Sequence, residues 1–472
     1  MRHEPKPLIL EMLGSVYGKL TRETTFHDRQ SVNWLSKRVR PARRTTRECL
    51  MLLNDPEADV LLDAATKGIP AAAAPLRLRD VAAQGWNVLA GDCPLPLAVI
   101  RTDIMAANSA WMMAFARLHG LLLAPHGKTT MAPALFARQL ADGAWAITVA
   151  TSQQLQVCLH AGIRRIILAN QPIGRTVDAC FAALEAHADL ELYVLADSLE
   201  GVALLARATR SASAPALRVL VEVGAAGART GCRDIPSALA VARAIDAAPG
   251  LRLAGVEAFE GVLPDTAAVT AFMSRVVETA IAIDAAGLFG DDVLLSAGGS
   301  AFFDLVALGF QSVKLSRPVR RVLRSGCYLT YDEFGYAKEQ LRMLRERRVE
   351  LPEGSLQPAL EVWSYVQSRP DPDKAILTVG KRDIGYDTGW PQPVAWYRRG
   401  LMPGPAPMPA GCAITGLNDQ HAHMSLPPSA ALAVGDMVVL GIAHPCTTFE
   451  RWQVLMLVDA RLNVVGAIRT FF

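Results

Sequence analysis

The chain has 472 residues, of which 51% are hydrophobic and 20% are charged. This composition supports a large buried core and excludes extensive disorder, and the length exceeds that of one ordinary domain. The formal net charge of +3 gives no general case for binding nucleic acid or an acidic membrane surface. The sequence therefore predicts a globular protein with more than one domain, and a two-domain enzyme fits best.

Basic residues are concentrated at the N-terminus. Residues 1–50 contain eleven Lys and Arg against five Asp and Glu, and the densest cluster is Lys37–Arg44. We expect a flexible arm here, or residues added by an upstream start codon. Nucleic-acid binding is the alternative, and it would depend on residues 1–50 alone. If the chain is an enzyme, deletion of these residues should leave its main activity intact.

The eight cysteines show no CxxC pair and no regular spacing, which argues against a zinc ribbon or a disulfide framework. A secretory leader pattern and an uninterrupted apolar run of membrane length are both missing from the sequence. We therefore expect a cytoplasmic protein without membrane or nucleic-acid partners.

Residues 51–97 are expected to lead into the first domain, which spans residues 98–335. In this domain, short apolar runs alternate with helix-like stretches rich in Ala, Leu, Gln and Arg, at spacings of roughly 20–40 residues that suit βα units. Eight such units favour an α/β fold of the TIM type, a (β/α)8 barrel, over an open sheet. The predicted strands are residues 121–124, 146–150, 165–169, 192–196, 217–223, 253–258, 293–297 and 313–316.

Residues 336–472 have a different character. Helical periodicity fades after residue 348, and short strand candidates follow at residues 360–366, 375–379, 437–440 and 453–458. Turn-rich pieces such as Met402–Pro407 separate them. This pattern predicts a C-terminal antiparallel β domain.

Lys128 follows the first predicted barrel strand, in the segment PHGKT. The carboxyl ends of barrel strands are where this fold carries out its chemistry. Lysine is also the residue that forms Schiff bases with carbonyl compounds and with pyridoxal phosphate (PLP). A solvated surface lysine is the ordinary alternative, so the assignment depends on the other motifs.

Three further segments lie where a barrel enzyme would bind a phosphorylated cofactor. Gly298, Gly299 and Ser300 follow the seventh predicted strand in SAGGS, and paired glycines let backbone N–H groups approach an anion. Arg229 lies among glycines after the fifth strand, and Tyr328 lies in RSGCY near the eighth. The arginine could face a cofactor ring or phosphate, and the phenol could reach a phosphate oxygen.

His444 and Cys446 form a His-x-Cys pair in the segment HPCTTF. Imidazole and thiolate are both good zinc ligands, but two protein ligands do not make a closed structural site. A metal bound here would keep positions open for water or a substrate hydroxyl, as catalytic metals do. A loop histidine beside a buried cysteine is the alternative.

Taken together, PHGKT, SAGGS, RSGCY and HPCTTF resemble the fold-type III PLP enzymes, within them the D-serine dehydratase and D-threonine aldolase group. The resemblance covers residues 80–472 and extends to the alanine racemase N-terminal barrel. It implies that Lys128 carries PLP, that Gly298, Gly299 and Ser300 hold the phosphate with help from Tyr328, and that Arg229 lies near the pyridine ring. His444 and Cys446 would bind a divalent metal, with zinc favoured and manganese or cobalt as alternatives.

The chemistry expected is dehydration of a β-hydroxy D-amino acid, such as D-serine or D-threonine, to a 2-oxo acid and ammonia. Lys128 would remove the Cα proton, and the metal would stabilise the departing hydroxide. Retro-aldol cleavage of D-threonine is the first alternative, although the resemblance associates that activity with a carboxylate in place of Cys446. A PLP-binding protein without turnover is a further alternative, and the family suggests a homodimer.

Overall fold

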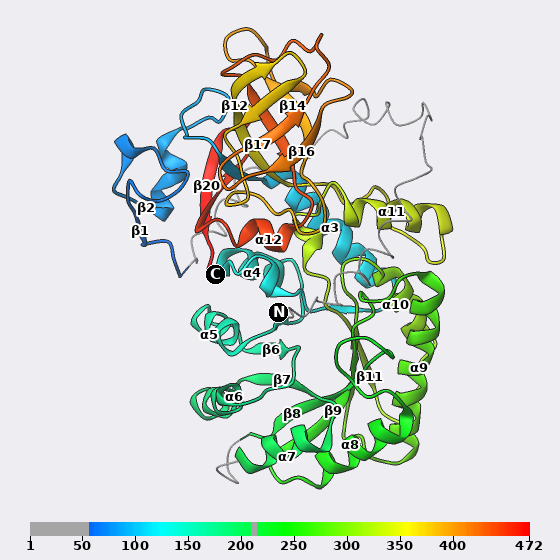
Figure 1. Ribbon diagram of the computed structural model, residues 1–472. Helices are drawn as coiled ribbons and strands as arrows, with labels where there is room; N and C mark the ends of the chain where they lie inside the picture. The colour runs from blue at the N-terminus through cyan, green and yellow to red at the C-terminus, as the bar shows by residue number, and fades with distance from the viewer. Residues whose placement is uncertain (1–55, 209–214) are drawn as a thin grey trace, which may run out of the picture. The chain divides into compact units, whose positions relative to one another are not determined.

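The computed structural model describes residues 56–208 and 215–472, so the arm predicted at residues 1–50 lies outside the described residues. The described residues belong to one compact unit. In Figure 1 the green strands and helices of an α/β barrel lie below an orange and red β domain.

The barrel consists of eight parallel strands, and it confirms the predicted fold class. The sheet order is β4-β11-β10-β9-β8-β7-β6-β5. Its two ends meet through a parallel bridge between His126 and Thr148 and through the Trp145 N–H, which donates to the Leu123 carbonyl at 2.7 Å. The strands are β4 (Leu122–Leu123), β5 (Ile147–Val149), β6 (Arg165–Leu168), β7 (Glu191–Ala196), β8 (Leu217–Val223), β9 (Leu251–Ala258), β10 (Val293–Ala297) and β11 (Val319–Leu323).

The eighth strand, β11, lies later in the chain than predicted. Residues 313–316 are irregular, and the β11 sequence VRRVL looks too polar for a buried strand. The two arginines of this strand have polar partners: Arg321 donates to the Val313 carbonyl at 2.8 Å, and Arg320 forms an ion pair with Asp292 at 2.8 Å. Both guanidinium groups are therefore satisfied at the edge of the barrel where the strands begin.

Helices cover the outside of the barrel. Three of them begin at a side chain that caps a free backbone N–H, as Thr151, Asp234 and Asp265 do. The covering helices are α4 (Pro133–Ala141), α5 (Ser152–His160), α6 (Arg175–Ala186), α7 (Leu199–Ala208), α8 (Ile235–Ala247), α9 (Thr266–Ala285) and α10 (Phe303–Gln311).

Among the described helices, α9 alone is long and apolar enough by composition to cross a membrane. In this fold it is a barrel helix. Its apolar face, which includes Val269, Phe272 and Val276, is buried, and it contacts α8, β9 and α10.

The β domain is largely antiparallel, as predicted. Its sheet runs in the order β15-β14-β18-β12-β13-β17-β16, and β19 and β20 form a hairpin beside it. Several short strands that periodicity did not reveal complete the sheet. The strands are β12 (Leu360–Asp371), β13 (Lys374–Leu377), β14 (Gln392–Tyr397), β15 (Ala406–Pro407), β16 (Ala413–Leu417), β17 (Ala422–Ser425), β18 (Met437–Gly441), β19 (Val454–Val458) and β20 (Val464–Arg469).

The described N-terminal segment, residues 56–101, also packs with the β domain. Its strand β3 (Leu97–Arg101) pairs antiparallel with β12 and parallel with β19. Ahead of it lie β1 (Leu61–Leu62) and β2 (Leu76–Arg77), and the apolar residues of this segment share a core with Trp363 and Met456. A domain boundary at residue 98 therefore falls inside a strand of the β domain.

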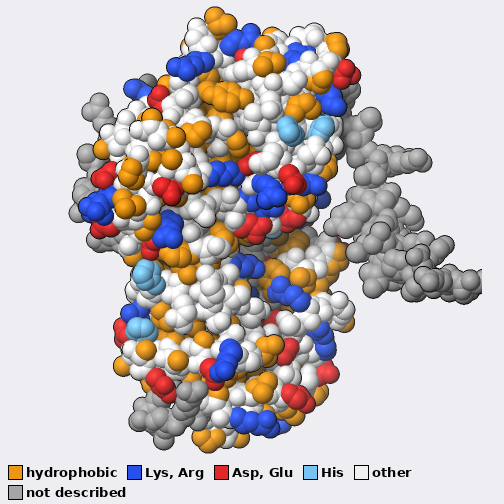
Figure 2. All heavy atoms as spheres, turned by 60° about the vertical axis from the view of Figure 1, so that its left-hand side comes forward, with side chains coloured by type: hydrophobic (Ala, Val, Ile, Leu, Met, Phe, Trp, Pro, Cys, Tyr) orange, Lys and Arg blue, Asp and Glu red, His pale blue; other side chains and the backbone are white. Residues whose placement is uncertain are grey.

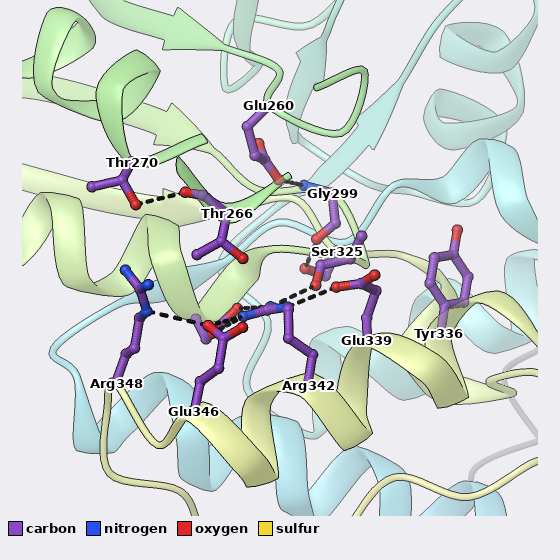
Figure 3. A network of polar contacts seen from close by, with 12 residues as sticks. Glu260, Thr266, Thr270, Gly299, Ser325, Tyr336, Glu339, Arg342, Glu346 and Arg348 are labelled. Atoms are coloured by element: carbon purple, nitrogen blue, oxygen red, sulfur yellow. Dashed lines mark hydrogen bonds and ion pairs between the residues drawn. The ribbon is translucent and has the colours of Figure 1, made fainter. Parts of the chain in front are cut away.

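Two helices carry the chain between the parts, α3 (Thr102–Leu118) into the barrel and α11 (Gly335–Glu346) out of it. Arg342 of α11 is buried and binds the buried Asp304 of α10 through two hydrogen bonds of 2.7 and 3.0 Å. It also binds Glu339 at 2.7 Å, and Figure 3 shows Glu339 and Glu346 on either side of it. This ion-pair network fastens α11 to the barrel beside the turn that precedes α10.

We expect Arg342→Ala to lower the free energy of unfolding by about 3–5 kcal/mol, because it leaves the Asp304 carboxylate buried without its partner. Chemical denaturation measures this change. The control is Arg382→Ala, which removes a pair with Asp419 in which both side chains are 71% exposed, so we expect a loss within about 1 kcal/mol. Equal losses in the two variants would contradict this account of α11.

Candidate active site

Three turns at the carboxyl ends of barrel strands meet at one place. The His126 N–H donates to the Arg324 carbonyl at 3.1 Å, and the Cys327 N–H donates to the Ser300 hydroxyl at 3.3 Å. A methyl group at Gly326 would lie 2.5 Å from the His126 carbonyl oxygen, so the turns touch where glycine leaves space. They are the HGKT turn after β4 (126–129), the GGS turn after β10 (298–300) and the SGC turn after β11 (325–327).

Lys128 lies in the middle of the HGKT turn, in a single turn of 3-10 helix spanning Gly127–Thr129. Its side chain is exposed, whereas both neighbours in the turn are buried. Any side chain at Gly127 would come within 2.9 Å of Phe136. The turn is therefore packed against the barrel wall and directs the Lys128 amine away from it.

The predicted role of Gly298 and Gly299 changes in the structure. Their N–H groups donate to the two carboxylate oxygens of Glu260, at 3.0 and 2.8 Å, as Figure 3 shows for Gly299. Glu260 is fully buried, and burial raises its pKa although these hydrogen bonds oppose the shift. The two N–H groups thus hold the shape of the GGS turn and are not free for a phosphate.

Ser300 and the SGC turn remain as candidates for the predicted phosphate site. Ser300 precedes the N-terminus of α10, where exposed N–H groups and the helix dipole favour an anion. The Ser325 hydroxyl donates to the Gly299 carbonyl at 2.6 Å and ties the two turns together. The Ser300 hydroxyl accepts from the Cys327 N–H, so its own proton is the donor that a phosphate beside these turns would meet.

Tyr328 does not face the GGS turn. Its ring is 1% exposed, and its polar neighbours are Gln139 of α4 and Ser109 of α3. Burial raises the pKa of the phenol. Tyr328 therefore lies between helices, because the 3-10 turn Cys327–Leu329 directs it into the core.

Arg324 and Glu257 form a buried ion pair inside the barrel mouth, and the sequence motifs pointed to neither residue. Arg324 also donates to the Ser296 hydroxyl at 2.8 Å. Burial raises the pKa of Glu257 to about 8, although the Arg324 charge works against this shift. Within the described chain, Nε of Arg324 and Oε2 of Glu257 are buried without a hydrogen-bond partner, which indicates a place for a polar ligand.

Arg229 reaches the same region from the loop after β8. Its guanidinium lies 5.0 Å from the centre of the Phe259 ring. Burial lowers the pKa of His126 far below its usual value, and the charges of Lys128, Arg324 and Arg229 add to this shift. Two predicted site residues, Arg229 and Lys128, thus lower the pKa of the same His126 imidazole and favour its neutral form.

The HPCT loop (444–447) brings the β domain to the HGKT turn. The Cys446 thiol donates to the Thr129 hydroxyl at 3.5 Å, and its sulfur lies 3.8 Å from that of Cys327. Contact between the two sulfurs lowers the pKa of Cys327, and the same contact together with burial raises the pKa of Cys446. The predicted metal ligand and the predicted PLP lysine are therefore in adjacent positions of one site.

His444 begins the short helix α12 (Pro445–Phe449) and is oriented by a carboxylate that the sequence motifs did not reveal. Its Nδ1 lies 2.6 Å from Oδ2 of Asp387. Partial burial acts to raise the pKa of Asp387, but hydrogen bonds from Thr447 and His444 outweigh it and keep the pKa low. In the described ranges no three His, Cys, Asp or Glu side chains converge on one metal position.

The surface of the molecule carries charges of both signs and one open cleft of note. On the face shown in Figure 2, Lys and Arg side chains are interspersed with Asp and Glu. An open cleft of about 630 Å³ lies between the barrel and the C-terminal tail, lined by residues such as Met131, Gln154 and Phe471. None of the predicted site residues lines this cleft, so it lies beside the site.

Comparison with known families matches both parts of the chain. The alanine racemase N-terminal domain matches residues 100–318, and a putative serine dehydratase domain matches residues 359–458. D-threonine aldolase of Arthrobacter sp. is 26% identical over 371 residues, which cover 77% of this chain and 88% of the relative. D-threo-3-hydroxyaspartate dehydratase of Delftia sp. (strain HT23) is 31% identical over 202 residues, 41% of this chain and 52% of the relative.

Solved structures agree with the fold. D-threonine aldolase from Filomicrobium marinum has a TM-score of 0.67 at 24% identity, covering 84% of this chain and 98% of that structure. D-threo-3-hydroxyaspartate dehydratase has been solved in a metal-free form in which one cysteine is changed to alanine. That structure has a TM-score of 0.61, also at 24% identity, and the match covers 82% of this chain and 99% of that structure. The joining of a racemase-like barrel to this β domain is shared by these proteins.

We expect Gly326→Ala to weaken PLP binding, because a methyl group forced between the HGKT and SGC turns costs about 1–3 kcal/mol. The φ of Gly326 is −108°, so the effect is steric and not conformational. The measurement is the amount of PLP bound per chain after desalting. Gly404→Ala is the matched control, since that glycine has no neighbour within 4 Å. Full PLP binding in both variants would contradict the close contact between the HGKT and SGC turns.

Proposed function

We propose that this chain, whose barrel and β domain match the alanine racemase and serine dehydratase family models, is a fold-type III PLP enzyme and a metal-dependent dehydratase of β-hydroxy D-amino acids. Its products would be a 2-oxo acid and ammonia, with D-serine and D-threonine as the substrates to test first. The observation that carries the proposal is the contact of Cys446 with Thr129, at 3.5 Å, directly beside Lys128. A metal-binding pair and a reactive amine then act on one substrate.

The residues at the barrel mouth fit PLP. Lys128 supplies an exposed amine, the Ser300 hydroxyl supplies a donor for the phosphate, and Arg324 has a buried Nε without a partner in the described chain. PLP supplies an electron sink for the carbanion at Cα. Arg229 lies close enough to share in holding the ring or the substrate carboxylate.

His444 and Cys446 fit a divalent metal that keeps open positions. Imidazole and thiolate together favour zinc over harder ions, with manganese or cobalt as alternatives. Such a metal supplies Lewis-acid stabilisation for an oxygen that leaves as hydroxide. A dehydratase relative has been solved in a metal-free form with a cysteine changed to alanine, which supports a cysteine as a metal ligand here.

The protein's own groups then divide the work. We assign to Lys128 the role of the base that removes the Cα proton. Its exposed amine belongs to the turn that meets both Cys446 and the SGC turn. His126 stays neutral beside it and cannot compete as a cation. Glu260 keeps the GGS turn rigid, so the substrate is oriented by a fixed frame.

Retro-aldol cleavage is the second candidate function. D-threonine aldolases are among the relatives, and one of them matches the larger share of this chain. An aldolase would break the Cα–Cβ bond and release glycine and acetaldehyde from D-threonine. The thiolate of Cys446 favours dehydration, and the product of D-threonine decides between the two. We extend the proposal to a cytoplasmic homodimer.

We expect Lys128→Ala to lose covalently bound PLP and to lower kcat/KM for D-serine at least about a hundredfold, since it removes both anchor and base. The absorbance spectrum and a 2-oxo-acid assay measure the two effects. Lys338→Ala, an exposed lysine of α11, is the control and should match the wild type. Retention of the PLP band in Lys128→Ala would overturn the assignment.

Removal of the metal by a chelator is expected to lower the rate of 2-oxo-acid formation at least about a hundredfold, because Lewis-acid stabilisation is worth several kcal/mol. Cys446→Ala should reproduce this loss without chelator, whereas Cys412→Ala, at a half-buried cysteine of the β domain, should not. Unchanged dehydration after metal removal would contradict the metal's role. Glycine as the main product of D-threonine would favour the aldolase.

A further inference from the structure

The HPCT loop is held from outside by a second loop, the GYDT loop (385–388) ahead of β14. The Gly385 N–H donates to the Thr448 hydroxyl at 3.1 Å, and the Thr388 hydroxyl donates to the Ala443 carbonyl at 3.0 Å. These contacts lie one residue beyond each end of the HPCT loop. The GYDT loop therefore spans the whole metal-binding segment.

Asp387 makes the two central contacts of this arrangement. Oδ2 lies 2.6 Å from Nδ1 of His444, and Oδ1 accepts a hydrogen bond from the Thr447 hydroxyl, also at 2.6 Å. One carboxylate thus holds residues on both sides of Cys446. Distances this short are typical of charge-assisted hydrogen bonds.

The contact with Asp387 sets the chemistry of the His444 ring. An ionised carboxylate is only an acceptor, so Nδ1 must carry the proton in this hydrogen bond. The lone pair of the neutral ring then lies on Nε2 and is available to a metal. Side-chain exposure is 23% for His444 and 46% for Asp387, so the pair is at the solvent edge of the site and not in the core.

Close packing restricts how the GYDT loop can lie. A methyl group at Gly385 would come within 2.4 Å of the Thr447 hydroxyl and 3.1 Å of the His444 carbonyl. The backbones of the two loops therefore touch at a glycine. This close approach places the Asp387 carboxylate against the imidazole without a water molecule between them.

We propose that Asp387 is a positioning residue for the metal, which fixes the tautomer and the orientation of His444. The inference rests on the metal site of the proposed function and deepens it. Carboxylate partners of this kind raise the basicity of a metal-binding histidine, and their loss typically weakens metal affinity about 10- to 100-fold. His444 is one of the two predicted protein ligands, so the orientation of its ring decides whether the pair with Cys446 can bind a metal.

A purely structural role is the competing explanation, because Asp387 also ties down the start of α12. In that case its removal would lower the stability of the metal-free protein and leave zinc affinity unchanged. A positioning role predicts the opposite pattern. Zinc affinity and apo-protein stability must therefore be measured on the same variants.

The test uses the full chain stripped of metal, with zinc affinity determined by competition with a chromogenic chelator and stability by thermal unfolding. Asp387→Ala is expected to weaken zinc binding about 10- to 100-fold with little change in the melting temperature of the apo protein. Asp387→Asn keeps an acceptor for Nδ1–H but not the charge, so its loss should be smaller. Thr447→Val leaves the His444 contact intact and should also lose less than Asp387→Ala.

Two controls separate failure of this inference from failure of the proposed function. Asp419→Asn changes an exposed carboxylate of the same domain and should bind zinc as the wild type does. Cys446→Ala should abolish tight zinc binding. If the wild type itself binds no zinc, the proposed metal site fails; if it binds zinc and Asp387→Ala binds equally well, or only the apo stability falls, the positioning role is overturned.

Discussion

The contact between the HPCT loop and the HGKT turn is the constraint on which the site depends. Cys446 belongs to the β domain and Thr129 to the barrel, and their side chains meet at 3.5 Å. Lys128 lies in the barrel, whereas His444 and Cys446 lie in the β domain, so the proposed site needs both parts. The helices α3 and α11 carry the chain between the parts, so they help to keep the two halves of the proposed site together.

The barrel mouth contains two buried carboxylates, and each has partners that offset the cost of burial. Glu257 is paired with Arg324, and Glu260 is held by two glycine N–H groups. Burial of such groups is unfavourable unless every one has a partner. Within the described ranges, Nε of Arg324 and Oε2 of Glu257 are buried without a hydrogen-bond partner, so the pair could still bind a polar ligand.

Periodicity predicted most of the barrel and missed elements whose pattern is disguised. The strand β11 was misplaced because Arg320 and Arg321 make it look polar, although both reach partners at the barrel edge. Strand β3 looked like a lead-in to the barrel, but its partners β12 and β19 lie more than 250 residues later in the chain. Pairing at that distance leaves no trace in local sequence.

By itself, the sequence determined the chemical types and their motifs: a lysine after a strand, a glycine pair, and a His-x-Cys segment. Local residue types carry that information because reactivity belongs to the side chain. Only the tertiary structure decided the partners. It gave the GGS N–H groups to Glu260, turned Tyr328 into the core, and brought Arg324, Cys327 and Asp387 to the site. Hydrogen-bond partners and burial depend on chain segments that meet in space, so the Lys128 motif meets Arg324 and Gly326 only when the barrel closes, and Cys446 only when the two domains are joined.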